Sequence, residues 1–127
     1  MNDRIFLALG SLLGFLAVAL GAFGGHLLKP RLAPDRYELF EIAARYHLTH
    51  ALALLAVAWA CSRWTGPWPA AAGWLLLAGI VIFSGSLYLL SLTGARWLGA
   101  ITPVGGLCLL AGWACLVLAA WRGALAP

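Results

Sequence analysis

Residues 5–28 have the sequence IFLALGSLLGFLAVALGAFGGHLL, an uncharged run that ends at Lys29 and Pro30. A helix needs about 20 predominantly apolar residues to cross the hydrocarbon core of a bilayer. Lysine can extend to the headgroups and proline breaks a helix, so the pair marks the membrane surface. The run is longer than the apolar region of a secretory signal peptide. We therefore predict a first transmembrane helix that stays in the protein.

Three further apolar segments follow, and each is bounded by turn or cap residues. The second begins at Asp35, whose partner Glu38 resembles a capping box, and is continuously apolar only after His47. Prolines and a glycine at residues 66–69 precede the third segment, and a short hairpin precedes the fourth. We predict an all-α fold: a single integral membrane domain, residues 1–127, forming a four-transmembrane-helix bundle with antiparallel neighbours. The expected helices are about residues 5–28, 35–63, 70–92 and 98–121.

The composition supports a membrane location. Of the 127 residues, 64% are hydrophobic and 9% are charged, whereas an average soluble domain has about 25% charged residues. Four crossings use nearly the whole chain and leave no room for a soluble catalytic domain. The basic residues behind the net charge of +4 are scattered singly near helix ends, which favours membrane lipids as partners and argues against nucleic acid.

The first third of the second helix mixes charged and apolar residues, which is typical of a segment at the membrane interface. Glu41 and Arg45 are one helical turn apart there. Side chains at this spacing are neighbours on a helix surface. We therefore predict an interfacial extension of this helix that carries an ion pair between Glu41 and Arg45.

Small residues form a row on two of the predicted helices, where another backbone can approach closely. On the fourth helix the row includes Gly105 and Gly112. On the first helix the glycines recur at steps of four, seven and four: Gly10, Gly14, Gly21 and Gly25. Two interpretations remain open: both rows pack within the bundle, or one row docks another membrane protein or a second copy of this chain.

Histidines are the ionisable residues predicted inside the membrane. His26 lies near the end of the first helix, while His47 and His50 lie near the membrane entry of the antiparallel second helix, so we expect all three at one membrane face. Such a group is a functional hypothesis by default. The alternatives are a structural hydrogen bond, haem or metal ligation, and proton or solute handling. Asp and Glu occur only at or outside the headgroup zone, which argues against a proton-coupled exporter.

Hydroxyl groups gather on the third predicted helix, at Ser84, Ser86 and Tyr88. In lipid, such groups most often join helices or bond to their own backbone. A path for a solute is the alternative. The sequence places no nucleophile and base at a spacing that indicates an active site, so we predict no catalytic residue.

Four ordered motifs run through the chain: residues 21–26 (GAFGGH), Tyr46 with residues 50–52 (HAL), residues 83–88 (FSGSLY), and residues 102–106 (TPVGG) followed by Gly112 and Trp113. As a set they resemble the YgdD-like family of small bacterial inner-membrane proteins of unknown function. The resemblance implies four transmembrane helices and brings no established activity. It draws attention to a polar cluster at the motif positions: His26, His50, Ser84, Ser86, Tyr88 and Thr102. His47 falls where family members can carry another residue, so a three-histidine metal site is less expected.

The first functional hypothesis is therefore a non-enzymatic accessory or scaffold protein of the bacterial inner membrane, without a metal site or cofactor. A row of small residues that points away from the bundle would support it. The second is a binding or transport protein for a small solute or proton, with His26, His50 and the third-helix hydroxyls around a polar pocket. A haem- or metal-binding protein is the third.

Overall fold

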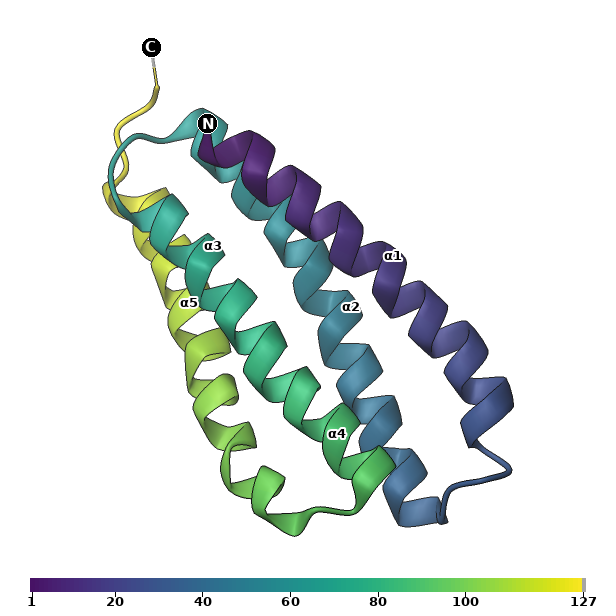
Figure 1. The fold of residues 1–127 in the computed structure, drawn as a ribbon. Helices are drawn as coiled ribbons and strands as arrows, with labels where there is room; N and C mark the ends of the chain where they lie inside the picture. The colour runs from purple at the N-terminus through teal and green to yellow at the C-terminus, as the bar shows by residue number, and fades with distance from the viewer. Residues whose placement is uncertain (127) are drawn as a thin grey trace.

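The structure is a computed structural model that describes residues 1–126, and it confirms the predicted all-helical class. Its long helices lie side by side and run alternately up and down, with both termini at one end (Figure 1). The elements are α1 (Asn2–Leu28), α2 (Pro34–Arg63), α3 (Trp68–Gly79), η1 (Ile80–Ser84), α4 (Gly85–Thr93), η2 (Arg96–Ala100) and α5 (Thr102–Arg122). Elements α3, η1 and α4 follow one another without a break and form the third rod.

Three helical segments are long and apolar enough to cross a membrane: Asn2–Leu28, Trp68–Thr93 and Arg96–Arg122. Helix α2 has 30 residues, about 45 Å at 1.5 Å per residue, so its length is sufficient. Its charged first third and its two histidines lower its mean hydropathy. Helix α2 also has more buried residues than any other element among residues 1–126, because it packs on α1 and on the third rod. A helix that faces protein needs fewer apolar side chains than one that faces lipid.

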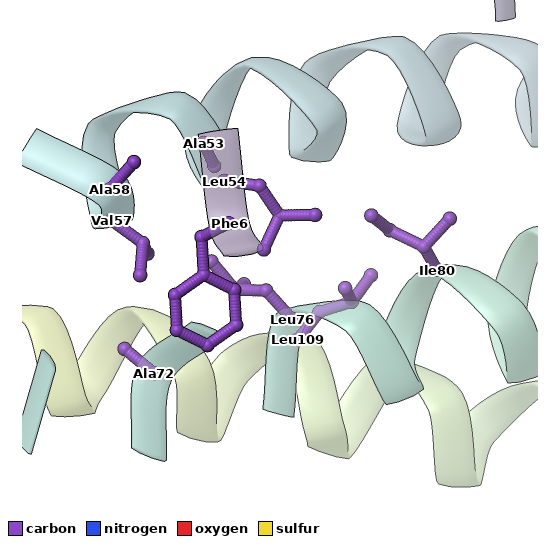
Figure 2. Packing of buried hydrophobic residues seen from close by; sticks show 9 residues of the cluster. All are labelled: Phe6, Ala53, Leu54, Val57, Ala58, Ala72, Leu76, Ile80 and Leu109. Atoms are coloured by element: carbon purple, nitrogen blue, oxygen red, sulfur yellow. The ribbon is translucent and has the colours of Figure 1, made fainter. Parts of the chain in front are cut away.

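The core lies mainly between α2 and the third rod, towards the end that holds the termini, and Phe6 of α1 and Leu109 of α5 complete it. Figure 2 shows the Phe6 ring of α1 directed into this cluster. The ring fills the space left by the missing side chain of Gly73 and meets Trp74 edge-on, with the ring centroids 5.2 Å apart. Complete burial of a phenylalanine contributes about 1.5–3 kcal/mol. Phe6 thus anchors the start of α1, which elsewhere packs almost entirely on α2.

A π-helical turn interrupts the third rod at Ile80–Ser84. Such turns contain one extra residue and rotate the side chains that follow. The rotation leaves Ser84 buried against α2, where its hydroxyl donates to the carbonyl of Ala43 at 2.9 Å. The segment also packs on α5, where a β-carbon on Gly105 would overlap the backbone nitrogen of Phe83. This turn is therefore the point at which the third rod holds both α2 and α5.

The predicted glycine row of α1 divides into two. Gly10 lies against Ala51 and Leu54 of α2, whereas a β-carbon on Gly14 or Gly21 would meet nothing within 4 Å. The residues buried on α2 include Gly10, Ala17 and Gly24, which are one heptad apart and so remain on the same side of the helix. Gly14 lies four residues from Gly10, which turns it by about 40° around the axis of α1 relative to Gly10. Gly25 lies at the edge, with its nearest neighbour the Tyr37 hydroxyl.

The small-residue row of α5 points inward. Gly105 packs on Phe83, and Gly112 packs on Leu76 so closely that a β-carbon there would lie 2.7 Å from the leucine side chain. Thus α5 uses its glycines within the bundle, while α1 leaves two of its four predicted glycines unused.

Candidate functional site

His50 lies at the centre of an aromatic group formed by α2, η1 and α5. Its Nδ1 is 2.7 Å from the carbonyl oxygen of Tyr46, one turn earlier. Its Nε2 is 3.2 Å from the indole nitrogen of Trp113 on α5. Phe83 completes the group, with its ring centroid 4.6 Å from that of Tyr46. The His50–Trp113 bond is a polar link between α2 and α5, which otherwise barely touch.

The two partners fix the tautomer of His50. A carbonyl oxygen only accepts a hydrogen bond and an indole N–H only donates one. Nδ1 of His50 must therefore carry the hydrogen and donate a hydrogen bond to the carbonyl oxygen of Tyr46. Nε2 must accept the hydrogen bond from the indole N–H of Trp113. Both ring nitrogens are engaged, so the neutral ring acts here as a structural connector.

His47 lies one turn before His50 on the same helix and faces a different neighbour. Its Nδ1 is 3.0 Å from the hydroxyl of Tyr88 on α4. Its Nε2 is buried and has no hydrogen-bond partner within the part of the chain that the structure describes. Since three residues correspond to about 300° of helix rotation, His47 and His50 diverge by about 60° and reach different rods. An unpartnered buried nitrogen costs about 1–3 kcal/mol.

The predicted cluster of six residues is divided into separate contacts. Ser86 and Thr102 meet each other, with their hydroxyl oxygens 2.7 Å apart, and join α4 to α5. Tyr88 pairs with His47, His50 pairs with Trp113, and Ser84 bonds to the α2 backbone. These contacts join helices and do not converge on one polar pocket.

His26 is the member of the predicted cluster that lies apart. It is exposed near the end of α1 and makes no hydrogen bond to residues 1–126. Gly24, two residues earlier, faces Phe40 of α2, and two residues turn a helix by about 200°. His26 therefore points away from α2. The prediction that it shares a membrane face with His50 is also wrong: Gly10 of α1 faces Ala51, the residue after His50, and His26 lies sixteen residues further along α1, about 24 Å of helix.

The interfacial part of α2 is held by a different contact from the predicted one. Glu41 and Arg45 are exposed, and within residues 1–126 they form no ion pair. An exposed pair gains little in a well-solvated region. Instead, Arg36 Nε donates to the carbonyl of Ser91 at 2.8 Å, which ties the start of α2 to the end of α4. The pKa of Tyr37 is raised, mainly by desolvation of its side chain and secondly by the nearby Glu41 carboxylate.

A cleft of about 580 Å³ opens between α2 and α5 beside the aromatic group. Its walls include Tyr46 and His50 of α2, Phe83 of η1, and Gly106, Leu110 and Trp113 of α5. Gly106 leaves part of this space empty, since a β-carbon there would come no closer than 3.8 Å to the Phe83 ring.

A second hollow lies on the outer face of α1 and is entirely apolar. Its volume is about 370 Å³, and it is lined by small residues, Gly14, Ala19 and Ala22, and by larger ones, Phe15, Val18 and Phe23. The two phenylalanines and Val18 are well exposed. This face is turned away from α2, and no element within residues 1–126 covers it.

The structure adds Trp113, His47 and the π-turn to the candidate site. Trp113 belongs to a motif that the sequence displays, but nothing in the pattern pairs it with His50. Within the described residues, no three His, Cys, Asp or Glu side chains are grouped so that they could hold a metal ion.

An all-helical chain with three helices able to span a bilayer belongs to the class of membrane proteins. The family model described as "Protein of unknown function (DUF423)" matches residues 20–106, more than half of the chain. The chain belongs to this family, and the predicted resemblance to the YgdD-like family is confirmed.

Curated relatives match over nearly the full length. The UPF0382 membrane protein YwdK of Bacillus subtilis is 45% identical over 119 residues, 92% of this chain and 96% of the relative. SH2409 of Staphylococcus haemolyticus is 42% identical, over 94% of this chain and 97% of the relative. The inner membrane protein YgdD of Escherichia coli K12 is 38% identical, over 96% and 93%. Their names describe membrane proteins and state no activity. No solved structure matches the chain.

Proposed function

We propose that this protein is a non-enzymatic scaffold or accessory protein of the bacterial inner membrane, a single domain that crosses the bilayer four times. Helix α2 is the fourth crossing. It is long enough, it lies among three helices that are apolar enough to span, and it runs antiparallel to α1 and to the third rod (Figure 1). Its residues 34–45 extend into the headgroup region.

The observation that carries the proposal is the open face of α1. Glycines in membrane helices most often allow a close approach between backbones. Gly10 and Gly24 serve that purpose against α2, whereas Gly14 has no neighbour within 4 Å and lines the outer hollow. Gly21 borders a separate hollow beside α2 and is not part of this face. Gly14 and Ala22 are small residues on this face, two steps of four apart, and the four-residue step is the spacing of small residues in paired membrane helices; Val18 lies between them.

A second copy of this chain is the partner that fits the face best. The exposed rings of Phe15 and Phe23 stand beside the hollow at Gly14 and Ala22. Two copies related by a two-fold axis along the membrane normal would each supply projecting side chains and a hollow to receive them. This self-complementarity is what an isologous contact requires. The absence of charged groups in the hollow also suits a contact within the hydrocarbon core.

The solute- or proton-handling alternative draws less support. The residues expected to line its pocket bond to one another or to the backbone in separate places, and His26 lies elsewhere. Docking through α1 requires none of these groups to be free.

The test is self-association of fluorescently labelled protein in liposomes, measured by energy transfer as the protein is diluted in lipid. We expect the wild type to form dimers and Gly14→Leu to raise the dimer dissociation constant at least about tenfold, or about 1.4 kcal/mol. A β-carbon at position 14 would meet nothing within 4 Å, so we expect the fold to accept the larger side chain. Gly106→Leu, which lies in the α2–α5 cleft, is the matched control and should dimerise like the wild type. A monomeric wild type, or unchanged association of Gly14→Leu, would contradict the proposal.

A further inference from the structure

The cleft between α2 and α5 has the dimensions of a ligand site. Its volume of about 580 Å³ falls within the range of about 300–1,000 Å³ found for small-molecule pockets. Leu107 and Leu110 border it and are about two-thirds exposed. In an apolar helix that spans the membrane, such exposure is to lipid. The cleft therefore opens sideways into the bilayer, and its ligand would enter from there.

The packing of α5 keeps this cleft open. Gly105 holds α5 against the backbone of Phe83 in η1, so α5 follows the third rod and does not close onto α2. The next residue, Gly106, faces the cleft and contributes no side chain to fill it. The part of α5 that lines the cleft runs from Pro103 to Trp113, eleven residues that extend over about 15 Å of helix, which is long enough to hold an extended hydrocarbon tail.

The chemistry of the walls restricts the head of the ligand. No charged side chain lines the cleft, so a phosphate or ammonium group would lie there without a counter-charge. His50 and Trp113 are bonded to each other. The Tyr46 hydroxyl makes no hydrogen bond to residues 1–126 and the residue is 43% exposed. It is thus a free donor beside the aromatic surfaces of Phe83 and Trp113.

We propose that the cleft binds an uncharged lipid with a flat ring as its head and a long apolar tail, the chemistry of an isoprenoid quinone. The ring would lie among Tyr46, Phe83 and Trp113, where flat aromatic surfaces give favourable stacked or edge-on contacts. A ring carbonyl would accept from the Tyr46 hydroxyl, and the tail would follow Leu107 and Leu110 along α5. The inference is independent of the proposed docking through α1, because the two sites share no residue.

The test is native mass spectrometry of the purified, delipidated protein with three probes: a short-chain isoprenoid quinone, a diacylglycerol and a phosphatidylglycerol. We expect saturable binding of one quinone per chain, and binding at least tenfold weaker for the other two. Gly106→Leu should weaken quinone binding at least tenfold, because the side chain would occupy the cleft. Tyr46→Phe should weaken it about threefold to tenfold through loss of one hydrogen bond. Gly14→Leu should bind like the wild type.

Unfolding temperatures establish that each variant is folded before its binding is compared. Failure of the wild type to bind quinone, or equal binding of either comparison lipid, would overturn the proposal. Unchanged quinone binding by Gly106→Leu would overturn it as well. Self-association is measured in a separate experiment, so a result that overturns one proposal does not decide the other.

Discussion

The backbone of Gly105 lies directly against the backbone of Phe83. A β-carbon at position 105 would overlap the Phe83 nitrogen and lie 2.7 Å from its α-carbon. Unlike a side chain, this backbone cannot rotate away, and it belongs to the π-turn that also holds α2 through Ser84. The contact therefore decides how α5 sits in the bundle, and so whether a cleft remains between α2 and α5.

Alanine substitution at neighbouring glycines should have opposite effects. In a helix, glycine to alanine gains about 0.8–1.0 kcal/mol in propensity. At Gly106 that gain should dominate, since the nearest atom is 3.8 Å from the added carbon. At Gly105 the overlap should dominate and destabilise the protein by about 1–3 kcal/mol. Reversible unfolding in mixed micelles measures both; equal stabilities for the two variants would show that the contact is not tight.

Removing the indole donor should destabilise the α2–α5 contact. In Trp113→Phe the Nε2 atom of His50 loses its partner, and we expect a loss of about 1–3 kcal/mol in unfolding free energy, part of it from lost packing. A double-mutant cycle with His50→Leu isolates the bond itself. We expect a coupling energy of about 1 kcal/mol. A coupling energy near zero would mean that the two rings only pack against each other.

The His47–Tyr88 pair should respond differently because one nitrogen of His47 already lacks a partner. Tyr88→Phe leaves the second nitrogen unpaired as well and should cost about 1–3 kcal/mol. Adding His47→Leu removes the unpaired nitrogens, so the double variant should recover most of that loss. The same unfolding assay decides the matter: a double variant less stable than Tyr88→Phe alone would rule out the unpaired nitrogens as the cause.

The sequence was sufficient to predict the helical class and the membrane location. Both follow from local properties: uncharged apolar runs of bilayer length, and turn residues between them. The family resemblance also followed from motifs that lie in order along the chain. None of these predictions depends on how one helix is rotated against another.

The candidate site depends on those rotations, and that is where prediction fell short. His26 and His50 were expected at one membrane face, but α1 and α2 pack with Gly10 opposite Ala51, which puts His50 far along the bundle from His26, and the position of Gly24 on the α2 side of α1 turns His26 away. His47 and His50 share a helix face at coarse resolution, but their divergence of about 60° is enough to pair them with Tyr88 and Trp113 on different rods. The π-turn at Ile80–Ser84 also rotates the side chains that follow it on the third rod, and no pattern of apolar residues predicts that rotation.

The glycine row of α1 shows the same limit. Glycines at steps of four, seven and four predict one continuous contact surface on α1. In the structure, only residues one heptad apart, Gly10, Ala17 and Gly24, stay on the side of α1 that faces α2. Whether Gly10 or Gly14 belongs to that series depends on the partner helix, in particular on the space that Phe40 needs opposite Gly24. Gly14, which this choice leaves on the outer face with Val18 and Ala22, is the basis of the proposed function.

Disulfide crosslinking in membranes of the native host tests that function most directly. With Cys61, Cys108 and Cys115 replaced by alanine, Val18→Cys places a single thiol on the outer face of α1. Leu16→Cys is the control, because it is also exposed but lies about 160° round the helix. Mild oxidation should convert Val18→Cys, and not Leu16→Cys, to a species of twice the 13.4 kDa chain mass. A monomer, an adduct with a different protein, or equal crosslinking at both positions would contradict it.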